Sequence, residues 1–185
     1  MDMTSDKRER ILAAAQRLVV RNGLQCSMAA IADEAGVATG SLYNYFDSKE
    51  ALVRGLYERV ALQMSEALMV PADPDPGQTL RNYFSRYVHF IGEDEERAKL
   101  FSYLDNTPLI SSNAAWIFGP FVTHGAELIM QAQAAGMVRP GSAKLMMSFL
   151  RGAVRNALKR RDGYGAFSEE DRQLFAQMCW DAIKV

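Results

Sequence analysis

Apolar residues recur every three or four positions along most of this 185-residue chain. That spacing places them on one face of an α-helix, and no segment alternates apolar and polar residues as a half-buried strand does. Apolar residues make up 49% of the chain, enough for a sizeable core, and no long unbroken run of them predicts a helix that crosses a membrane. The sequence therefore predicts an all-α fold of about nine helices.

Glycine and hydroxyl residues set the first helix boundaries. Asn22-Gly23 ends a helix over about 5–22 in the usual C-terminal manner. Ser27 is placed to cap the next helix, and Gly36 breaks it. A very short helix is then expected over about 39–45.

Later helices also carry start signals. Asp47 and Glu50 predict a capping box that opens a long helix, and the three prolines within residues 71–77 cannot continue it. Ser168, followed three residues later by Asp171, caps a final helix over about 169–184. On that helix the expected buried residues are Leu174, Phe175, Met178, Cys179, Ala182 and Ile183.

The two short helices around Gly36 have the layout of a helix-turn-helix. The first braces the second through Ile31 and Ala32, and Gly36 can adopt the positive φ that a sharp turn requires. The second helix has too little apolar surface to exist unless it is packed, and it projects small and polar residues outward. Such a face fits the major groove of DNA, so the pattern predicts a DNA-binding head.

Overall charge does not favour nucleic-acid binding. The net charge is −1, and residues 1–60 hold equal numbers of basic and acidic residues. Affinity for DNA would therefore depend on placed contacts rather than on a basic field. Five basic residues cluster in the first helix, where they either face phosphates or form an ordinary solvated helix face: Lys7, Arg8, Arg10, Arg17 and Arg21.

A run of fixed spacings extends this motif over residues 8–56. The run is Arg10-Ile11-Leu12, Ala15, Gly23, Ile31-Ala32, Ala35-Gly36-Val37, Gly40-Ser41-Leu42-Tyr43, Tyr45-Phe46, Ser48-Lys49-Glu50 and Leu52. It resembles the TetR family of bacterial repressors. The resemblance implies a helix-turn-helix DNA-binding domain at 1–48 and a helical ligand-binding and dimerisation domain at 49–185.

The resemblance also implies the DNA contacts of the head. One departure is Ala38, where family members usually carry a serine or threonine that caps the recognition helix. Alanine at an N-cap costs roughly 1 kcal/mol, so either Thr39 shifts the cap by one residue or the helix starts weakly. The implied contact residues are Ser27, Met28, Thr39, Gly40, Ser41, Tyr43, Asn44, Tyr45 and Lys49.

A homodimer built from the last two long helices is a further implication. The apolar face over 142–161 is wider than one neighbouring helix needs, although an ordinary buried core helix is the alternative interpretation. A two-fold dimer reads a palindromic operator. The expected interface residues are Leu145, Met146, Phe149, Leu150, Ala153, Val154, Ala157, Phe175 and Met178.

The middle helices are expected to hold a small-molecule inducer. Aromatic and methionine side chains with few charges favour an apolar or aromatic ligand, although each candidate is also consistent with plain core packing. Ligand binding would release a repressor from DNA. The candidate lining residues are Met64, Phe84, Tyr87, His89, Phe101, Tyr103, Trp116, Phe118, Phe121 and His124.

Other functional classes find little support in the sequence. His89 and His124 are the only histidines and lack a metal-binding spacing, and no glycine-rich phosphate loop is present, so no enzyme activity, catalytic residue, metal or cofactor is expected. Cys26 and Cys179 are expected to be buried thiols. The polar N-terminus lacks a signal peptide, which predicts a cytoplasmic protein, nucleoid-associated when bound to DNA. A TetR-like protein that acts through protein partners, an activator, and a regulator without a ligand remain open alternatives.

Overall fold

The computed structural model describes residues 3–69, 71–105, 117, 119–160 and 167–185. Throughout these residues the regular structure is helical, and the single β-type pairing is an isolated bridge between Val138 and Lys184. The predicted all-α fold is confirmed. The chain forms two compact units. The first unit holds the described residues up to Val60 together with 99–105. The second unit holds Ala61–Ala98 and the described residues from 117 to the C-terminus.

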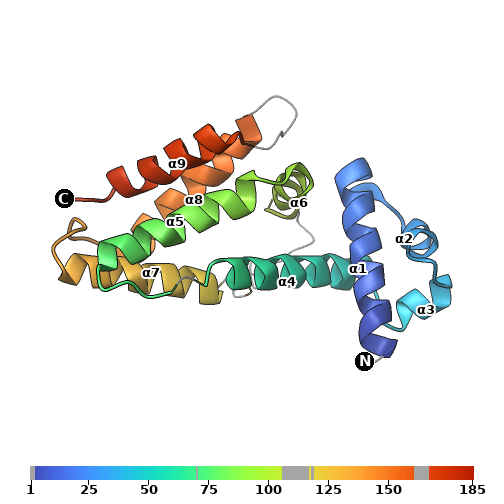
Figure 1. Cartoon of the computed structure of the whole chain (residues 1–185). Coiled ribbons are helices and arrows are strands. Elements are labelled where there is room, and N and C mark those ends of the chain that lie inside the picture. Colours follow the sequence, from blue (N-terminus) through green and yellow to red (C-terminus); the bar gives the residue numbers. More distant parts are fainter. Residues whose placement is uncertain (1–2, 70, 106–116, 118, 161–166) are drawn as a thin grey trace. The chain divides into compact units, whose positions relative to one another are not determined.

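The first unit is an N-terminal head in which α1 packs against α2 and α2 against α3 (Figure 1). Its centre is apolar: Ile11, Ile31 and Leu42 are fully buried. The helices of this unit are α1 (Met3–Asn22), a 3-10 turn (Gly23–Gln25), α2 (Met28–Ala35), α3 (Thr39–Tyr43), the greater part of α4 (Lys49–Ala67) and the end of α6 (Glu95–Asp105).

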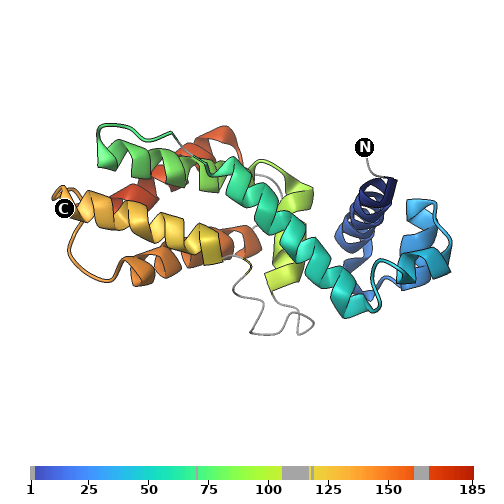
Figure 2. The same cartoon turned by 90° about the horizontal axis from the view of Figure 1, so that it is seen from below.

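The second unit is a layered helical bundle. In it α5 packs against both α7 and α9, and α7 packs against α8 (Figure 2). The C-terminal residues are held to the segment before α8, because the Arg139 amide donates to the Ile183 carbonyl at 2.9 Å. Its helices, besides the end of α4 and the start of α6, are α5 (Pro76–Gly92), α7 (Gly119–Ala134), α8 (Ala143–Arg160) and α9 (Glu169–Asp181).

Two of the three predicted N-caps are confirmed. Ser27 Oγ accepts from the Ala30 amide at 3.1 Å, and Ser168 forms a full capping box with Asp171. The predicted capping box of Asp47 and Glu50 is wrong. The cap lies one residue later, because α4 begins at Lys49 and the Ser48 hydroxyl accepts from the Ala51 amide at 3.0 Å.

The start of α3 is a weak one. Ala38 is its N-cap, with φ −64° and ψ 141°, and no side chain caps the helix. Thr39 is therefore the first helical residue and does not shift the cap. Because five residues cannot sustain a helix in water, α3 depends on its packing against the rest of the head.

Burial on α9 differs from the expectation. Cys179 and Ile183 are buried as predicted, but Leu174 and Met178 are 60% and 53% exposed. Their predicted burial is wrong for a single chain, since they lie on the side of α9 that no described element covers. Cys26 and Cys179 are both buried thiols, and burial raises the pKa of Cys179 to about 12.

The contact between α5 and α9 includes a polar cluster around Glu169. Its carboxylate accepts from Arg172 at 2.8 Å, from Gln173 at 2.7 Å and from the His89 ring at 3.3 Å. These hydrogen bonds, led by that from Arg172, lower the pKa of Glu169 to about 2. The ionised carboxylate is thus favoured in the folded protein.

The missing cap of α3 predicts a stabilising substitution. In Ala38→Ser a hydroxyl can accept an amide of the first turn, because Ala38 already has the extended backbone of an N-cap. We expect the free energy of unfolding in urea to rise by about 1 kcal/mol. Ser27→Ala, which removes the cap of α2, should lower it by a similar amount, and an unchanged value for both variants would contradict the assigned caps.

The Glu169 cluster predicts a pH dependence of stability. Because folding lowers the pKa of Glu169, its stabilising contribution is complete above about pH 4.5 and is lost as the pH falls toward about 2. Urea midpoints measured across this range should therefore fall less for Glu169→Gln than for the wild type. Equal slopes for the two proteins would show that the cluster does not act on the ionised carboxylate.

Candidate nucleic-acid interface and effector cavity

The turn between α2 and α3 is fixed by backbone hydrogen bonds. Gly36 has φ +64°, a region that favours glycine, and its amide donates to the Asp33 carbonyl at 3.0 Å. The Val37 amide donates to the Ala32 carbonyl at 3.0 Å. From α1, the Arg10 guanidinium donates to the Ala35 carbonyl at 2.8 Å. These contacts fix the angle at which the chain enters α3.

The inner side of α3 and its following turn is held by two apolar anchors, Leu42 and Phe46, which are 0% and 4% exposed. The Phe46 ring lies against α4 at Gly55, where a Cβ atom would come within 2.8 Å of Phe46 Cε1. Gly55 thus makes room for the Phe46 ring, a role that was not predicted from the sequence. A glycine inside a strongly helical pattern is the signal that points to such a close approach.

The outer side of the helix-turn-helix presents most of the predicted contact residues. Tyr43 is 48% exposed, and Ser41, Tyr45 and Lys49 are half-buried. Met28 is buried, which leaves its main-chain amide at the first turn of α2 as its available group. The other exposed members are Ser27, Thr39, Gly40 and Asn44.

Most arginines of α1 have partners inside the head. Arg17 donates to Glu34 at 2.8 Å, and this hydrogen bond lowers the pKa of the Glu34 carboxyl. Arg21 lies 3.9 Å from the same carboxylate, and Arg10 binds carbonyl oxygens of the turn. The Arg8 guanidinium lies 5.3 Å from the centre of the Phe46 ring. Much of the basic cluster therefore braces the head.

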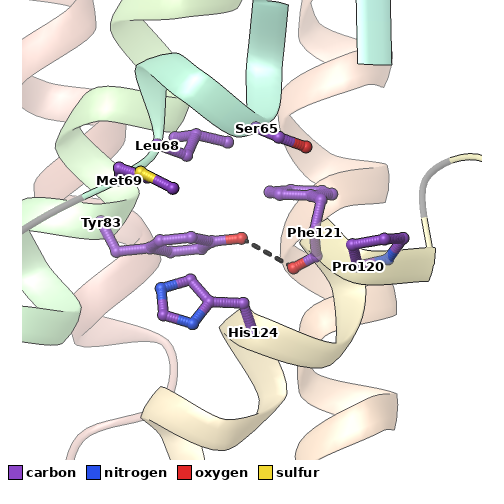
Figure 3. A pocket seen from close by; sticks show the side chains of 7 residues that line it. All are labelled: Ser65, Leu68, Met69, Tyr83, Pro120, Phe121 and His124. Atoms are coloured by element: carbon purple, nitrogen blue, oxygen red, sulfur yellow. Dashed lines mark hydrogen bonds between the residues drawn. The ribbon is translucent and has the colours of Figure 1, made fainter. Parts of the chain in front are cut away.

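The second unit contains a cavity of about 210 Å³ beside the end of α4 (Figure 3). The Tyr83 hydroxyl donates to the Phe121 carbonyl at 3.1 Å, and the two rings stack at 5.8 Å. The His124 ring meets Tyr83 edge-on at 5.7 Å. The lining residues are Ser65, Leu68, Met69, Tyr83, Pro120, Phe121 and His124.

Two of the ten predicted ligand residues, Phe121 and His124, line this cavity. Met64, Phe84 and Tyr87 are buried without lining it. His89 binds the Ser85 carbonyl at 2.7 Å as well as Glu169, and the Tyr103 ring lies against Gly23 in the first unit. The side chains of Phe101, Trp116 and Phe118 lie outside the described residues.

The remaining lining residues were not singled out from the sequence. Tyr83 and Tyr87 both fit the apolar stripe of α5, and only the packing of α7 decides which ring faces the cavity. Ser65 lies in the last turn of α4, and Leu68 and Met69 directly follow the helix, a position that gives no sign of a cavity.

The predicted dimer residues divide between two sides of α8 and α9. Leu150 and Val154 are buried within one chain, while Leu145, Phe149 and Met178 are 70%, 61% and 53% exposed. The half-buried members are Met146, Ala153, Ala157 and Phe175. Together with Leu174, the exposed apolar side chains form a surface on these two helices, which we call the α8–α9 surface.

Among the described residues, none of the helices is both long enough and apolar enough to span a bilayer.

Comparison with known proteins places the head in a family. Residues 11–56 match the profile described as bacterial regulatory proteins, tetR family. An HTH-type transcriptional regulator of uncharacterised role from Haemophilus influenzae is 32% identical over 110 residues, which are 59% of this chain and 53% of that protein. The chain thus aligns with about half the length of this curated relative.

Solved structures extend the likeness to the whole fold. A protein from Shewanella sp. PV-4, described as a tetR-family transcription regulator, superposes with a TM-score of 0.80 at 25% identity over 97% of this chain and 98% of its own. A TetR-family transcription regulator from Marinobacter aquaeolei VT8 shares the fold, with a TM-score of 0.81 at 22% identity over 100% and 99% of the two chains. The head thus matches the tetR-family profile, and the fold as a whole is similar to that of solved tetR-family regulators.

Proposed function

We propose that this protein is a homodimeric repressor that binds a palindromic operator and is released from it by a small apolar or aromatic ligand. The observation that carries the proposal is the outer side of the helix-turn-helix. There α3 presents exposed polar residues while Leu42 and Phe46 anchor it from behind. Two such heads related by a two-fold axis would read half-sites about 35 Å apart, one turn of DNA.

Contacts with the DNA backbone supply the first part of the affinity. Lys49 stands in the first turn of α4, where free main-chain amides and its ammonium can meet one phosphate. Tyr43 offers an exposed hydroxyl beside the recognition helix. Thr39 and Asn44 lie at the two ends of α3 and are exposed, so they are the candidates for base edges.

The α8–α9 surface supports the homodimer. Four large apolar side chains, Leu145, Phe149, Leu174 and Met178, are each more than half exposed. Exposed large apolar side chains of this kind are typical of an association site. Gly152 lies on the same side of α8, with nothing within 4 Å of a Cβ placed there, so a second helix can approach closely.

The cavity supports control by a ligand. α4 is one continuous helix that carries Lys49 in its first turn and Ser65, a cavity residue, in its last. A ligand that binds better to the DNA-incompetent state lowers DNA affinity, and DNA lowers ligand affinity by the same factor. The cavity and α4 thus offer a physical route for release.

The DNA-binding test compares two classes of variant on the region upstream of the protein's own operon. Tyr43→Ala and Lys49→Ala should weaken binding to every DNA by about tenfold, because they remove backbone contacts. Thr39→Ala and Asn44→Ala should instead change which operator is preferred. Mobility shifts measure both effects. Lys144→Ala is the matched control, since Lys144 is an exposed lysine of α8. A lack of specific binding by the wild type at low salt would contradict the proposed function.

The dimer makes a separate prediction. Phe149→Asp places a charge in the middle of the α8–α9 surface, so we expect monomers at micromolar concentration and weak operator binding. Sedimentation velocity gives the oligomeric state. Met130→Asp is the control, because Met130 is an apolar residue of α7 that is 51% exposed outside this surface. Dissociation by both variants, or by neither, would contradict the assigned interface.

A further inference from the structure

Arg151 on α8 is a half-buried arginine whose Nε is buried without a hydrogen-bond partner, as are the Nε atoms of Arg155 and Arg172. No ion pair joins Arg151 to a described residue. Taking a guanidinium out of water without a counter-charge is unfavourable, because its lost hydration is not replaced. Four half-buried arginines, by contrast, each meet a carboxylate oxygen within 3.2 Å: Arg59, Arg81, Arg97 and Arg172.

The charge of Arg151 acts on the wall of the effector cavity. Its guanidinium carbon lies over the Phe121 ring, 5.3 Å from the ring centre, and Phe121 lines the cavity (Figure 3). Burial raises the pKa of Tyr83, and the positive charge of Arg151 opposes that rise. Arg151 therefore influences two cavity residues that come from two different helices.

Arg151 borders a hollow of about 320 Å³ along α8, and the described lining of this hollow contains no acidic residue. The guanidinium lies over the face of Phe121, a weak restraint compared with a salt bridge.

The cavity itself selects a compact, flat and apolar body. Its volume is about 210 Å³. Benzene fits in an engineered apolar cavity of about 150 Å³, so this space suits one six-membered ring with a short substituent. The rings of Tyr83, Phe121 and His124 offer faces and edges to an aromatic ligand. The described lining holds no carboxylate that would repel an acid.

We propose that the effector is a monocyclic aromatic acid whose ring fills this cavity and whose carboxylate binds the Arg151 guanidinium. The inference deepens the proposed function, and it rests on the cavity being the effector site. Guanidinium and carboxylate form two parallel hydrogen bonds, so Arg151 would turn from the Phe121 face to the acid when the ligand enters. The acid would supply the counter-charge that Arg151 otherwise lacks.

Calorimetric titration of the full-length protein with matched pairs tests the proposal. The probes are benzoate against benzamide, and methylbenzoates against their methyl esters. We expect the acids to bind at least about tenfold more tightly than their neutral counterparts. Arg151→Gln should remove this preference while the neutral compounds bind as before, and Arg151→Lys should keep part of it. Arg155→Gln is the matched control, since it removes an arginine one helical turn away and should leave the preference in place.

The outcomes separate this inference from the proposed function. Neutral and acidic compounds that bind equally to the wild type, or an acid preference that survives Arg151→Gln, would overturn the acid assignment and leave the DNA-binding regulator intact. A panel in which no acid binds would overturn it as well. Mobility shifts with the same proteins provide an independent measurement. If the ligand-free wild type does not bind the operator, that result contradicts the proposed function and does not bear on the acid assignment.

Discussion

The helix-turn-helix of this protein depends on the packing of Leu42 and Phe46 into the head. α3 has five residues and no side-chain cap, so it has neither the length nor the terminal hydrogen bond that stabilises a helix alone. Its position is set from outside itself, by the buried anchors and by the absence of a side chain at Gly55. The polar residues Thr39 and Asn44 on its outer side are exposed, so their side chains are available for contacts with a partner.

The charged residues of the head also contribute mainly to its packing. With equal numbers of acidic and basic residues in its first sixty positions, the head has no strong positive field. Arg10 and Arg17 stabilise the turn and the packing of α2 instead of adding to such a field. In the proposed dimer, affinity would come from a few placed contacts and from the pairing of two heads on one operator, so the α8–α9 surface would matter for DNA binding as much as the recognition helix.

Much of the fold could be predicted from the sequence because helix boundaries depend on residues that are close together in the chain. Gly36 needs a positive φ, and Ser27 and Ser168 cap helices that follow directly. The sequence also predicted which side chains of the recognition helix and its following turn point inward, as with Leu42 and Phe46. The cavity was harder, since its walls come from three helices and the facing ring depends on tertiary packing: Tyr83, not Tyr87, lines it. Burial on α9 failed for a related reason, because an apolar residue such as Leu174 reads the same whether it faces its own chain or another.

The second unit contains a contrast between its two surfaces of interest. The α8–α9 surface is apolar and exposed, so association with a like surface removes it from water at little electrostatic cost. Around the cavity the opposite holds: the aromatic wall is already packed, and the unfavourable feature is the uncompensated charge of Arg151. An apolar surface is satisfied by a partner chain, whereas a charge beside an aromatic cavity is satisfied by a small anion. The two features of one helix, α8, therefore favour two different kinds of partner.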